Sequence, residues 1–517
     1  MIDAIQDRLQ DNDALRRAML VLLAVGLGAA GGLAIVAGNP VVPFAVVAAL
    51  VALPWLVARP MADLLLAVAT ITLLPFAALP VRLAVLTPTL LEVALVMLYV
   101  AWFLRLLQRP DERLQRTPVD VWLLVFLGST LFSFVLGLSR DLRTDVIHNY
   151  VKLILSIGIF FAAANLLRTP RMVGLVLRSL IVLGGAAAAL GIVLWRLPDS
   201  LAASLLGRLR VIGYPTDRIV RYVEDNPALG ERAVGTQVDP NSFGGLLVVI
   251  TVLTGVALLA RRPILPRWLL GALFLADAAA LVLTNSRSAL VGVLAAGALV
   301  GTLRYRRLWV WGVVGAVVIA ALGVGSGYFA RLAAGLRFED QASLMRLAEY
   351  RNAIDIIGRY PAFGVGFGTA GELDLTTGVS SIYLTVAERA GLLGLALFLV
   401  TVFVFLAAAL PAIRRSAALR DNPRDRDWPA LDTALLGGTA ALFGTLAVGL
   451  VDHYYFNIEF PHMAALFWLV AGTVMASRAL VLAPAPTPDI EPTAPANGDI
   501  KEGPNTPIPL PNAPVRP

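Results

Sequence analysis

Arginine is the residue type in this sequence whose number and spacing could perform chemistry. The chain holds 42 lysine and arginine residues, of which only Lys152 and Lys501 are lysines. An arginine guanidinium presents a planar fork of donors that matches phosphate and carboxylate groups. Three arginines stand in short polar motifs: Arg232 in RAVGTQVDPNSFG, Arg287 in TNSRSAL and Arg346 in RLAEYRNAIDIIGRYP. These motifs make the three arginines candidates for binding an anionic group.

The helix expected over 340–358 separates two kinds of arginine. Arg351, Asp355 and Arg359 fall on one i, i+4 stripe, so ion pairing on the helix surface explains them. Arg346 lies on another, largely apolar side, and a charge there needs a partner, which an anionic ligand could provide. Acidic residues nearly balance the arginines in this part of the chain, so ion pairs within folded loops are the alternative for each arginine.

Two further motifs could contribute to a reaction. His453 follows Asp452 in GLVDHYYFNIEFPH, where a carboxylate could orient an imidazole that acts as a general base. The same aromatic sequence is equally typical of an anchor at the membrane interface. The glycine-rich PAFGVGFGTAG at 361–371 allows sharp turns or a close approach to a ligand. No strand and helix flank it in the dinucleotide-binding arrangement, so we reject that interpretation.

The composition places these residues in a membrane protein. Of the 517 residues, 58% are hydrophobic and only 15% are charged, which excludes a water-soluble globular chain. The chain has no cysteine, which excludes disulfides and thiolate chemistry, and its three histidines do not favour a metal centre. We therefore expect neither metal nor cofactor. Because basic residues of membrane proteins anchor cytoplasmic loops, the net charge of +7 does not indicate a nucleic-acid partner.

Apolar runs of about 20 residues predict an all-α polytopic integral membrane protein with about 14 transmembrane helices. The predicted spans are 18–37, 41–58, 61–78, 89–107, 119–138, 150–167, 174–195, 241–260, 267–284, 287–303, 308–327, 382–409, 432–451 and 460–477. With a cytoplasmic N-terminus, most arginines outside two long outer loops fall in cytoplasmic connections, as the positive-inside rule requires. Both termini are therefore expected in the cytoplasm.

This count divides the chain into seven segments. They are a cytoplasmic N-terminus (1–17), the N-terminal transmembrane helices (18–195), an extracytoplasmic loop (196–240), transmembrane helices (241–327), a long extracytoplasmic loop (328–381), the C-terminal transmembrane helices (382–477) and a Pro-rich tail (483–517). The tail is poor in large apolar residues and is predicted to be disordered and cytoplasmic. Asp277 and Glu388 are carboxylates inside predicted spans, and such residues are functional candidates.

Four motifs occur in the order found in the O-antigen ligase and O-antigen polymerase superfamily of polytopic bacterial glycosyltransferases, which the chain resembles. They begin at Arg232, Leu283, Arg346 and Tyr383, and the last of them reads YLTVAERAGLLGLALFL. The four motifs lie in the C-terminal half of the chain. The long outer loop 328–381 also joins the pair of late spans that a long loop usually joins in this family. The resemblance implies a fold like that of the GT-C-type glycosyltransferases.

The resemblance also implies a substrate and a site. The donor would be an undecaprenyl-pyrophosphate-linked glycan, used on the outer face of the bacterial inner membrane without a nucleotide sugar or a metal. Arg232, Arg287 and Arg346 correspond to outer arginines of the family and would stabilise the pyrophosphate leaving group. Tyr383 of the YL motif would contribute to substrate binding. A chain-length regulator is a further partner that the resemblance suggests.

One position departs from the family pattern. Ligases of this family usually carry a histidine shortly before the tyrosine of the YL motif, whereas residues 379–382 read VSSI. The sequence therefore favours a polymerase over a ligase. The candidate bases are then His453, the most accessible histidine, with Asp452, Glu372 and Asp374 as alternatives. A polysaccharide flippase or transporter is the alternative of another class. It should place its charges along a path through the membrane.

Overall fold

The structure is a computed structural model that describes part of the chain. The described residues are 59–79, 87–108, 113–138, 143–215, 220–321, 337, 339, 341–368, 379–419 and 428–483. The N-terminal segment 1–17, the first two predicted spans and the tail beyond residue 483 lie outside these residues. The same holds for two of the candidate bases, Glu372 and Asp374. What the sequence predicts for these parts stays a prediction.

Helices make up most of the described chain. They are α4 (Pro60–Leu73), α5 (Leu90–Gln108), α6 (Asp120–Gly137), α7 (Thr144–Leu166), α8 (Pro170–Arg196), α9 (Asp199–Gly207), α10 (Pro240–Leu259), α11 (Arg267–Leu283), α12 (Arg287–Leu303), α13 (Arg307–Ala321), α15 (Gln341–Arg359), α16 (Ile382–Leu419), α17 (Trp428–Thr433), α18 (Thr439–Val448) and α19 (Pro461–Leu482). Within the described ranges, 8 helical runs are long and apolar enough to cross a membrane, with Trp428–Val448 counted as one. The chain is thus a multi-pass, mainly helical membrane protein. The predicted total of about 14 spans and the GT-C-like fold stay predictions.

The helices begin where local sequence signals favour a start. Proline is the first residue of α4, α8, α10 and α19, where its missing N–H would have no helical partner. The side chains of Thr169, Asp239 and Ser286 accept backbone N–H groups in the first turns of α8, α10 and α12. Each predicted span from 61–78 onwards overlaps at least one described helix.

Two spans differ from their predicted form. The helix predicted over 61–78 ends at Leu73, because Pro75 disfavours a helical conformation at Leu74 and has no N–H to donate. The helix predicted over 382–409 extends to Leu419 but is broken at Gly391, where φ is 73° and ψ is 179°. A Cβ atom at Gly391 would collide with the backbone of Ala362, so the break depends on glycine.

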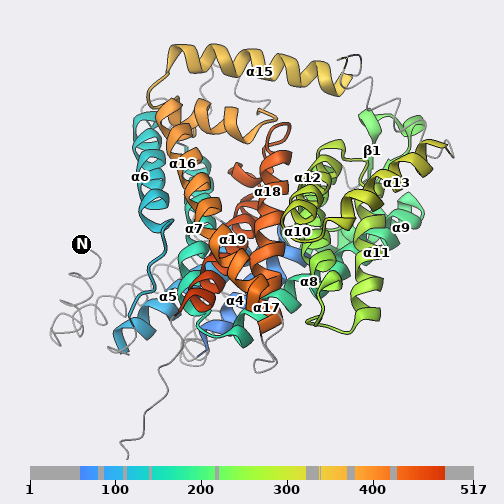
Figure 1. The fold of residues 1–517 in the computed structure, drawn as a ribbon. Coiled ribbons are helices and arrows are strands. Elements are labelled where there is room, and N and C mark those ends of the chain that lie inside the picture. The colour runs from blue at the N-terminus through green and yellow to red at the C-terminus, as the bar shows by residue number, and fades with distance from the viewer. Residues whose placement is uncertain are drawn as a thin grey trace, which may run out of the picture. The chain divides into compact units, whose positions relative to one another are not determined.

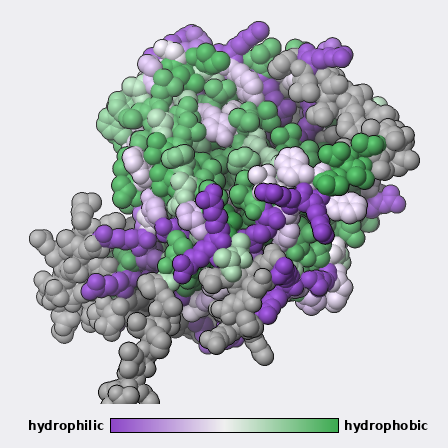
Figure 2. Space-filling model, viewed as in Figure 1, coloured by the Kyte–Doolittle hydropathy of each residue, from purple (hydrophilic) through white to green (hydrophobic). Residues whose placement is uncertain are grey.

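The helix α19 lies in the middle of the bundle (Figure 1). It packs along α7 and also contacts α16, α18 and α4, and it is buried continuously from His462 to Ser477. Around it, α16 packs along α6, α12 along α18, and α10 against α8 and α11. On the face drawn in Figure 2, hydrophobic residues gather over the helices and hydrophilic residues gather towards the ends of the bundle. This distribution suits a bundle surrounded by lipid.

The segment predicted as the first outer loop, 196–240, folds into short elements. After α9 come η1 (Arg208–Ile212), β1 (Arg221–Tyr222), η2 (Val223–Asp225), η3 (Pro227–Leu229) and β2 (Glu231–Arg232). The two strands form an antiparallel hairpin in which Arg221 pairs with Arg232. The hairpin therefore places two arginines side by side close to the start of α10.

The second predicted outer loop contains α15, which is the helix expected over 340–358. It lies across one end of the bundle (Figure 1). The glycine-rich segment after it packs against the break in α16. The amide of Val365 donates to the Glu388 carbonyl at 2.9 Å, and that of Gly366 donates to the Arg389 carbonyl at 3.0 Å. A Cβ atom at Gly364, where φ is 67°, would collide with Glu388. These glycines thus serve a close backbone contact.

Candidate functional site

The helix α15 is fixed so that Arg346 points towards the bundle. Glu349 accepts the backbone N–H of Ser380 at 2.9 Å, and the Tyr350 hydroxyl donates to the Ser380 carbonyl, also at 2.9 Å. Ala353, on the same side of the helix as Arg346, is completely buried. Arg346 therefore lies on the side of α15 that faces the bundle. The i, i+4 ion pair between Asp355 and Arg359 is also present, and it is exposed.

Arg232 lies in the hairpin, and two hydrogen bonds hold its guanidinium in place. Its Nε donates to the Thr284 carbonyl at 2.8 Å, and its Nη2 donates to Asn241 Oδ1 at 2.5 Å. Beside it, Arg221 Nη2 lies 3.6 Å from Asp239 Oδ2. Thr284 belongs to the TNSRSAL motif, so this contact joins two of the motifs that the sequence singled out.

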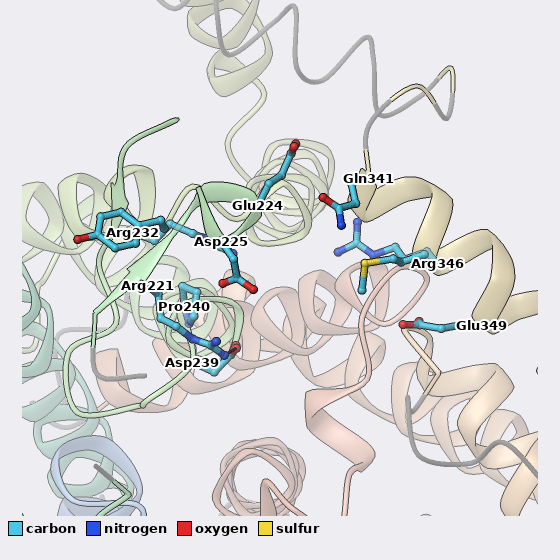
Figure 3. A pocket seen from close by; sticks show the side chains of 11 residues that line it. Arg221, Glu224, Asp225, Arg232, Asp239, Pro240, Gln341, Arg346 and Glu349 are labelled. Atoms are coloured by element: carbon cyan, nitrogen blue, oxygen red, sulfur yellow. Dashed lines mark ion pairs between the residues drawn. The ribbon is translucent and has the colours of Figure 1, made fainter. Parts of the chain in front are cut away.

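A cavity of about 380 Å³ lies between two walls. One wall comes from the hairpin and the start of α10, and the other comes from α15 (Figure 3). Its lining residues are Arg221, Tyr222, Glu224, Asp225, Arg232, Asp239, Pro240, Gln341, Met345, Arg346 and Glu349. The cavity thus brings together Arg232 and Arg346, which are far apart in the sequence, and adds Arg221. Three guanidinium groups around one cavity can bind a multiply charged anion.

Asp452 is a buried carboxylate whose charge acts on Arg232 and is acted on by Arg346. Its Oδ2 accepts the Ser288 hydroxyl at 3.2 Å, and its Oδ1 accepts the backbone N–H of His453 at 2.9 Å. Burial raises the pKa of the Asp452 carboxyl to about 7, although the positive charge of Arg346 and these two hydrogen bonds act to lower it. A carboxyl with this pKa can exchange a proton near neutral pH.

His453 does not form the expected hydrogen bond with Asp452. Its Nδ1 lies 3.9 Å from Asp452 Oδ1, which is too far for a hydrogen bond. The ring stacks instead on Tyr454, with centroids 5.0 Å apart. Burial lowers the pKa of the imidazole to about 4; the negative charge of Asp239 opposes this shift, and the positive charge of Arg346 adds to it. His453 is therefore neutral at neutral pH.

Four of the predicted site residues do not line the cavity: Asp452, His453, Arg287 and Tyr383. Arg287 is the half-buried first residue of α12, after the cap Ser286 and before Ser288, which contacts Asp452. Tyr383 lies in the first turn of α16, and its hydroxyl donates to the Leu446 carbonyl at 2.9 Å. Its position thus has a structural explanation, and a role in substrate binding stays a prediction.

The two carboxylates that the sequence places inside predicted spans do not line the cavity. Asp277 is fully buried and accepts the Thr254 hydroxyl at 3.1 Å, and Glu388 is buried in α16. His148 lies 2.6 Å from Glu92, far from the site in sequence. Within the parts of the chain that the structure describes, no group of three or more histidine, aspartate or glutamate side chains is arranged to hold a metal ion.

The comparison with known families agrees with this geometry. Residues 270–399 match the family described as O-Antigen ligase. The matched stretch includes Arg287, Arg346 and Tyr383, whereas Arg232 and Asp452 lie on either side of it. No curated protein matches the chain. The match over residues 270–399 therefore supports the resemblance to the O-antigen ligase and O-antigen polymerase superfamily.

Proposed function

We propose that the protein is a membrane glycosyltransferase that polymerises undecaprenyl-pyrophosphate-linked glycan repeat units into a surface polysaccharide. The observation that carries the proposal is the cavity in which Arg221 and Arg232 face Arg346, with Asp452 close to Arg346. A pyrophosphate group carries several negative charges, and arginines bind its oxygens in bidentate fashion. The matching family supports the same class of reaction.

The reaction follows from the charges that develop during transfer. The acceptor hydroxyl oxygen attacks the anomeric carbon of the donor glycan, and the bond from that carbon to the pyrophosphate oxygen breaks. The leaving pyrophosphate gains negative charge, which Arg232 and Arg346 stabilise, with Arg221 and Arg287 adding positive charge nearby. The hydroxyl proton passes to a protein base, and undecaprenyl pyrophosphate leaves with the electron pair of the broken bond.

Of the two candidate bases in the described residues, we assign the proton to Asp452. A base near neutral pH works best when its pKa lies close to the working pH. The pKa of Asp452 is about 7, whereas that of His453 is about 4. An imidazole with so low a pKa is a weak proton acceptor. His453 is the neighbour of Asp452 in the chain, and its ring stacks on Tyr454.

The membrane location follows from the same proposal. The apolar helices around the cavity would hold the prenyl chain of the donor while its pyrophosphate reaches the arginines. With both termini in the cytoplasm, the cavity faces the outer side of the bacterial inner membrane, where flipped lipid-linked glycans are found. A chain-length regulator would act on the growing polymer after it leaves this site.

Alanine variants of the cavity arginines test the proposal. Loss of one charge-assisted contact to the leaving group costs about 2–4 kcal/mol of transition-state stabilisation, or roughly 30- to 1000-fold in rate. Arg346→Ala and Arg232→Ala should show such losses with the purified protein in nanodiscs and lipid-linked glycan extracted from cells that lack the gene. Arg351→Ala, on the exposed face of α15, is the matched control and should stay near wild type. Normal rates in all the cavity variants would show that the site is wrong.

The products separate the polymerase from its alternatives. A polymerase lengthens the glycan with lipid-linked repeat units as the only substrate. A ligase forms no product until a second lipid or protein acceptor is added, and the description of the matching family favours this as the second candidate. A flippase moves the lipid-linked glycan between leaflets without breaking the bond to the pyrophosphate. Chromatography of the glycan from these three incubations tells which reaction occurs.

A further inference from the structure

Asn241 does more than continue the first turn of α10. Its Oδ1 accepts Nη2 of Arg232 at 2.5 Å. Because a guanidinium only donates hydrogen bonds, this contact fixes the orientation of the amide, with the oxygen towards Arg232 and the nitrogen away from it. The Thr284 carbonyl, 2.8 Å from Nε, is the second acceptor of the same guanidinium. Two acceptors from different parts of the chain therefore fix the orientation of the Arg232 guanidinium.

The free nitrogen of this amide meets Tyr454. The Tyr454 hydroxyl lies near the side chains of Asn241 and Asp239, which shift its pKa in opposite directions. Burial and the negative charges of Asp239 and Asp452 raise its pKa well above the ordinary value, so the phenol stays neutral. It can then donate to the Asp239 carboxylate and accept from the Asn241 amide. Its ring is held edge-on against Phe460, with centroids 4.8 Å apart.

Asp239 closes the network. Its Oδ1 accepts the backbone N–H groups of Asn241 at 2.8 Å and Ser242 at 2.9 Å, while its Oδ2 lies 3.6 Å from Arg221. Helix capping needs only Asp239 and these backbone amides. It needs neither the side chain of Asn241 nor the hydroxyl of Tyr454. Capping therefore leaves these two polar groups, and their contacts with each other, unexplained.

We propose that Asn241 and Tyr454 are positioning residues that hold the Arg232 guanidinium at the cavity wall. The inference rests on the proposed function, because Arg232 must bind the pyrophosphate for its orientation to matter. The buried Tyr454 hydroxyl orients the Asn241 amide, and the amide oxygen orients Arg232. Tyr454 is separated from Asp452 only by His453, so the same network also connects Arg232 with the segment that carries Asp452.

A double-mutant cycle tests this inference, with purified variants in nanodiscs and lipid-linked glycan extracted from cells that lack the gene. Asn241→Ala should lower kcat about 10- to 100-fold, because Arg232 loses one of its two acceptors. The double variant Asn241→Ala/Arg232→Ala should be within about threefold of Arg232→Ala alone, because Asn241 acts only through Arg232. A purely structural role for Asn241 would multiply the two losses instead and so overturn the inference.

Conservative variants give a second readout. Asn241→Asp keeps an acceptor for Arg232 and should restore most of the rate, whereas Tyr454→Phe removes one hydroxyl and should lower kcat about tenfold. Farnesyl diphosphate, which has a diphosphate and no sugar, should inhibit both Asn241→Ala and Tyr454→Phe less strongly than wild type. Thr169→Ala, which removes the cap of α8, is the control for lost capping and should keep wild-type kcat. If Asn241→Ala does not accumulate, Tyr454→Phe and Asn241→Asp carry the same test.

The outcomes separate this inference from the proposed function. If Arg232→Ala loses activity while Asn241→Ala and Tyr454→Phe remain within about threefold of wild type, the positioning role is wrong and the proposed function stands. If Arg232→Ala itself keeps full activity, the proposed function fails, and the positioning role fails with it.

Discussion

Ser288→Ala should move the pH dependence of glycan transfer to higher pH. If Asp452 is the base, it must be ionised to accept the acceptor proton, so activity should rise with pH and level off above its pKa. That pKa is about 7 because burial outweighs the opposing effects of Arg346, the His453 amide and the Ser288 hydroxyl. Removing the hydroxyl removes one group that favours the ionised form, and the pKa must therefore rise.

The expected displacement follows from one hydrogen bond. The Ser288 hydroxyl donates to Asp452 Oδ2 at 3.2 Å, which is long for an O–H···O bond. A bond of this kind contributes about 1 kcal/mol, and one pKa unit corresponds to about 1.4 kcal/mol. The rising part of the pH–rate profile, called the limb below, should therefore move to a pH about 0.7 unit higher. Initial rates measured between about pH 5.5 and pH 9 cover the whole limb.

Two controls decide whether Asp452 produces the limb. Asp452→Asn should lose both the limb and most of the activity. Burial also raises the pKa of Glu231 to about 7, but Glu231→Gln should leave the profile unchanged because Glu231 is not among the groups that act on Asp452. His453, with a pKa of about 4, cannot produce a limb near 7. A limb that stays in place in Ser288→Ala, or that survives in Asp452→Asn, would refute this assignment.

Three other predictions concern topology, folding and the histidine. A cysteine at Ala228, in the first predicted outer loop, should react with an impermeant thiol reagent in intact spheroplasts, whereas one at Arg262 should react only after permeabilisation; the reverse pattern would invert the topology. Gly364→Ala should lower stability by at least about 2 kcal/mol, seen as a lower melting temperature in detergent, because its φ is 67° and the new Cβ would meet the α16 backbone. Gly128→Ala is its control, since nothing lies within 4 Å of the added atom. His453→Ala should keep kcat within about tenfold of wild type, and a larger loss without a change in stability would make His453 the base.

The sequence predicts those parts of the fold and site that depend on local patterns. Apolar runs and capping residues locate the described helices, and the polar motifs identify Arg232 and Arg346, which the fold brings to one cavity. Long-range contacts could not be predicted. Asn241 has a sufficient local explanation as part of a helix start, so nothing in the sequence indicates that it binds Arg232. Ser288 likewise gives no sign of its contact with Asp452, 164 residues away.

The break in α16 could not be predicted either, because it too depends on a long-range contact. Gly391 lies in a continuous apolar run, where a glycine is compatible with an unbroken transmembrane helix. Only its positive φ and the nearness of Ala362 make the glycine necessary. The glycine-rich segment that packs against this break predicted sharp turns or a close approach to a ligand, whereas its close contact is with the backbone of α16.

Arg346 links binding of the donor to the strength of the base. The positive charge of Arg346 lowers the pKa of Asp452. A bound pyrophosphate would neutralise much of that charge, so the pKa of Asp452 should rise and the carboxylate should become a stronger base when the donor is in place. Because the pH dependence of kcat/KM reports the free enzyme and that of kcat reports the complex, the limb for kcat should lie at higher pH than the limb for kcat/KM. If the two limbs coincide, binding of the donor does not change the effect of Arg346 on Asp452. The pyrophosphate would then bind Arg221 and Arg232 without contacting Arg346.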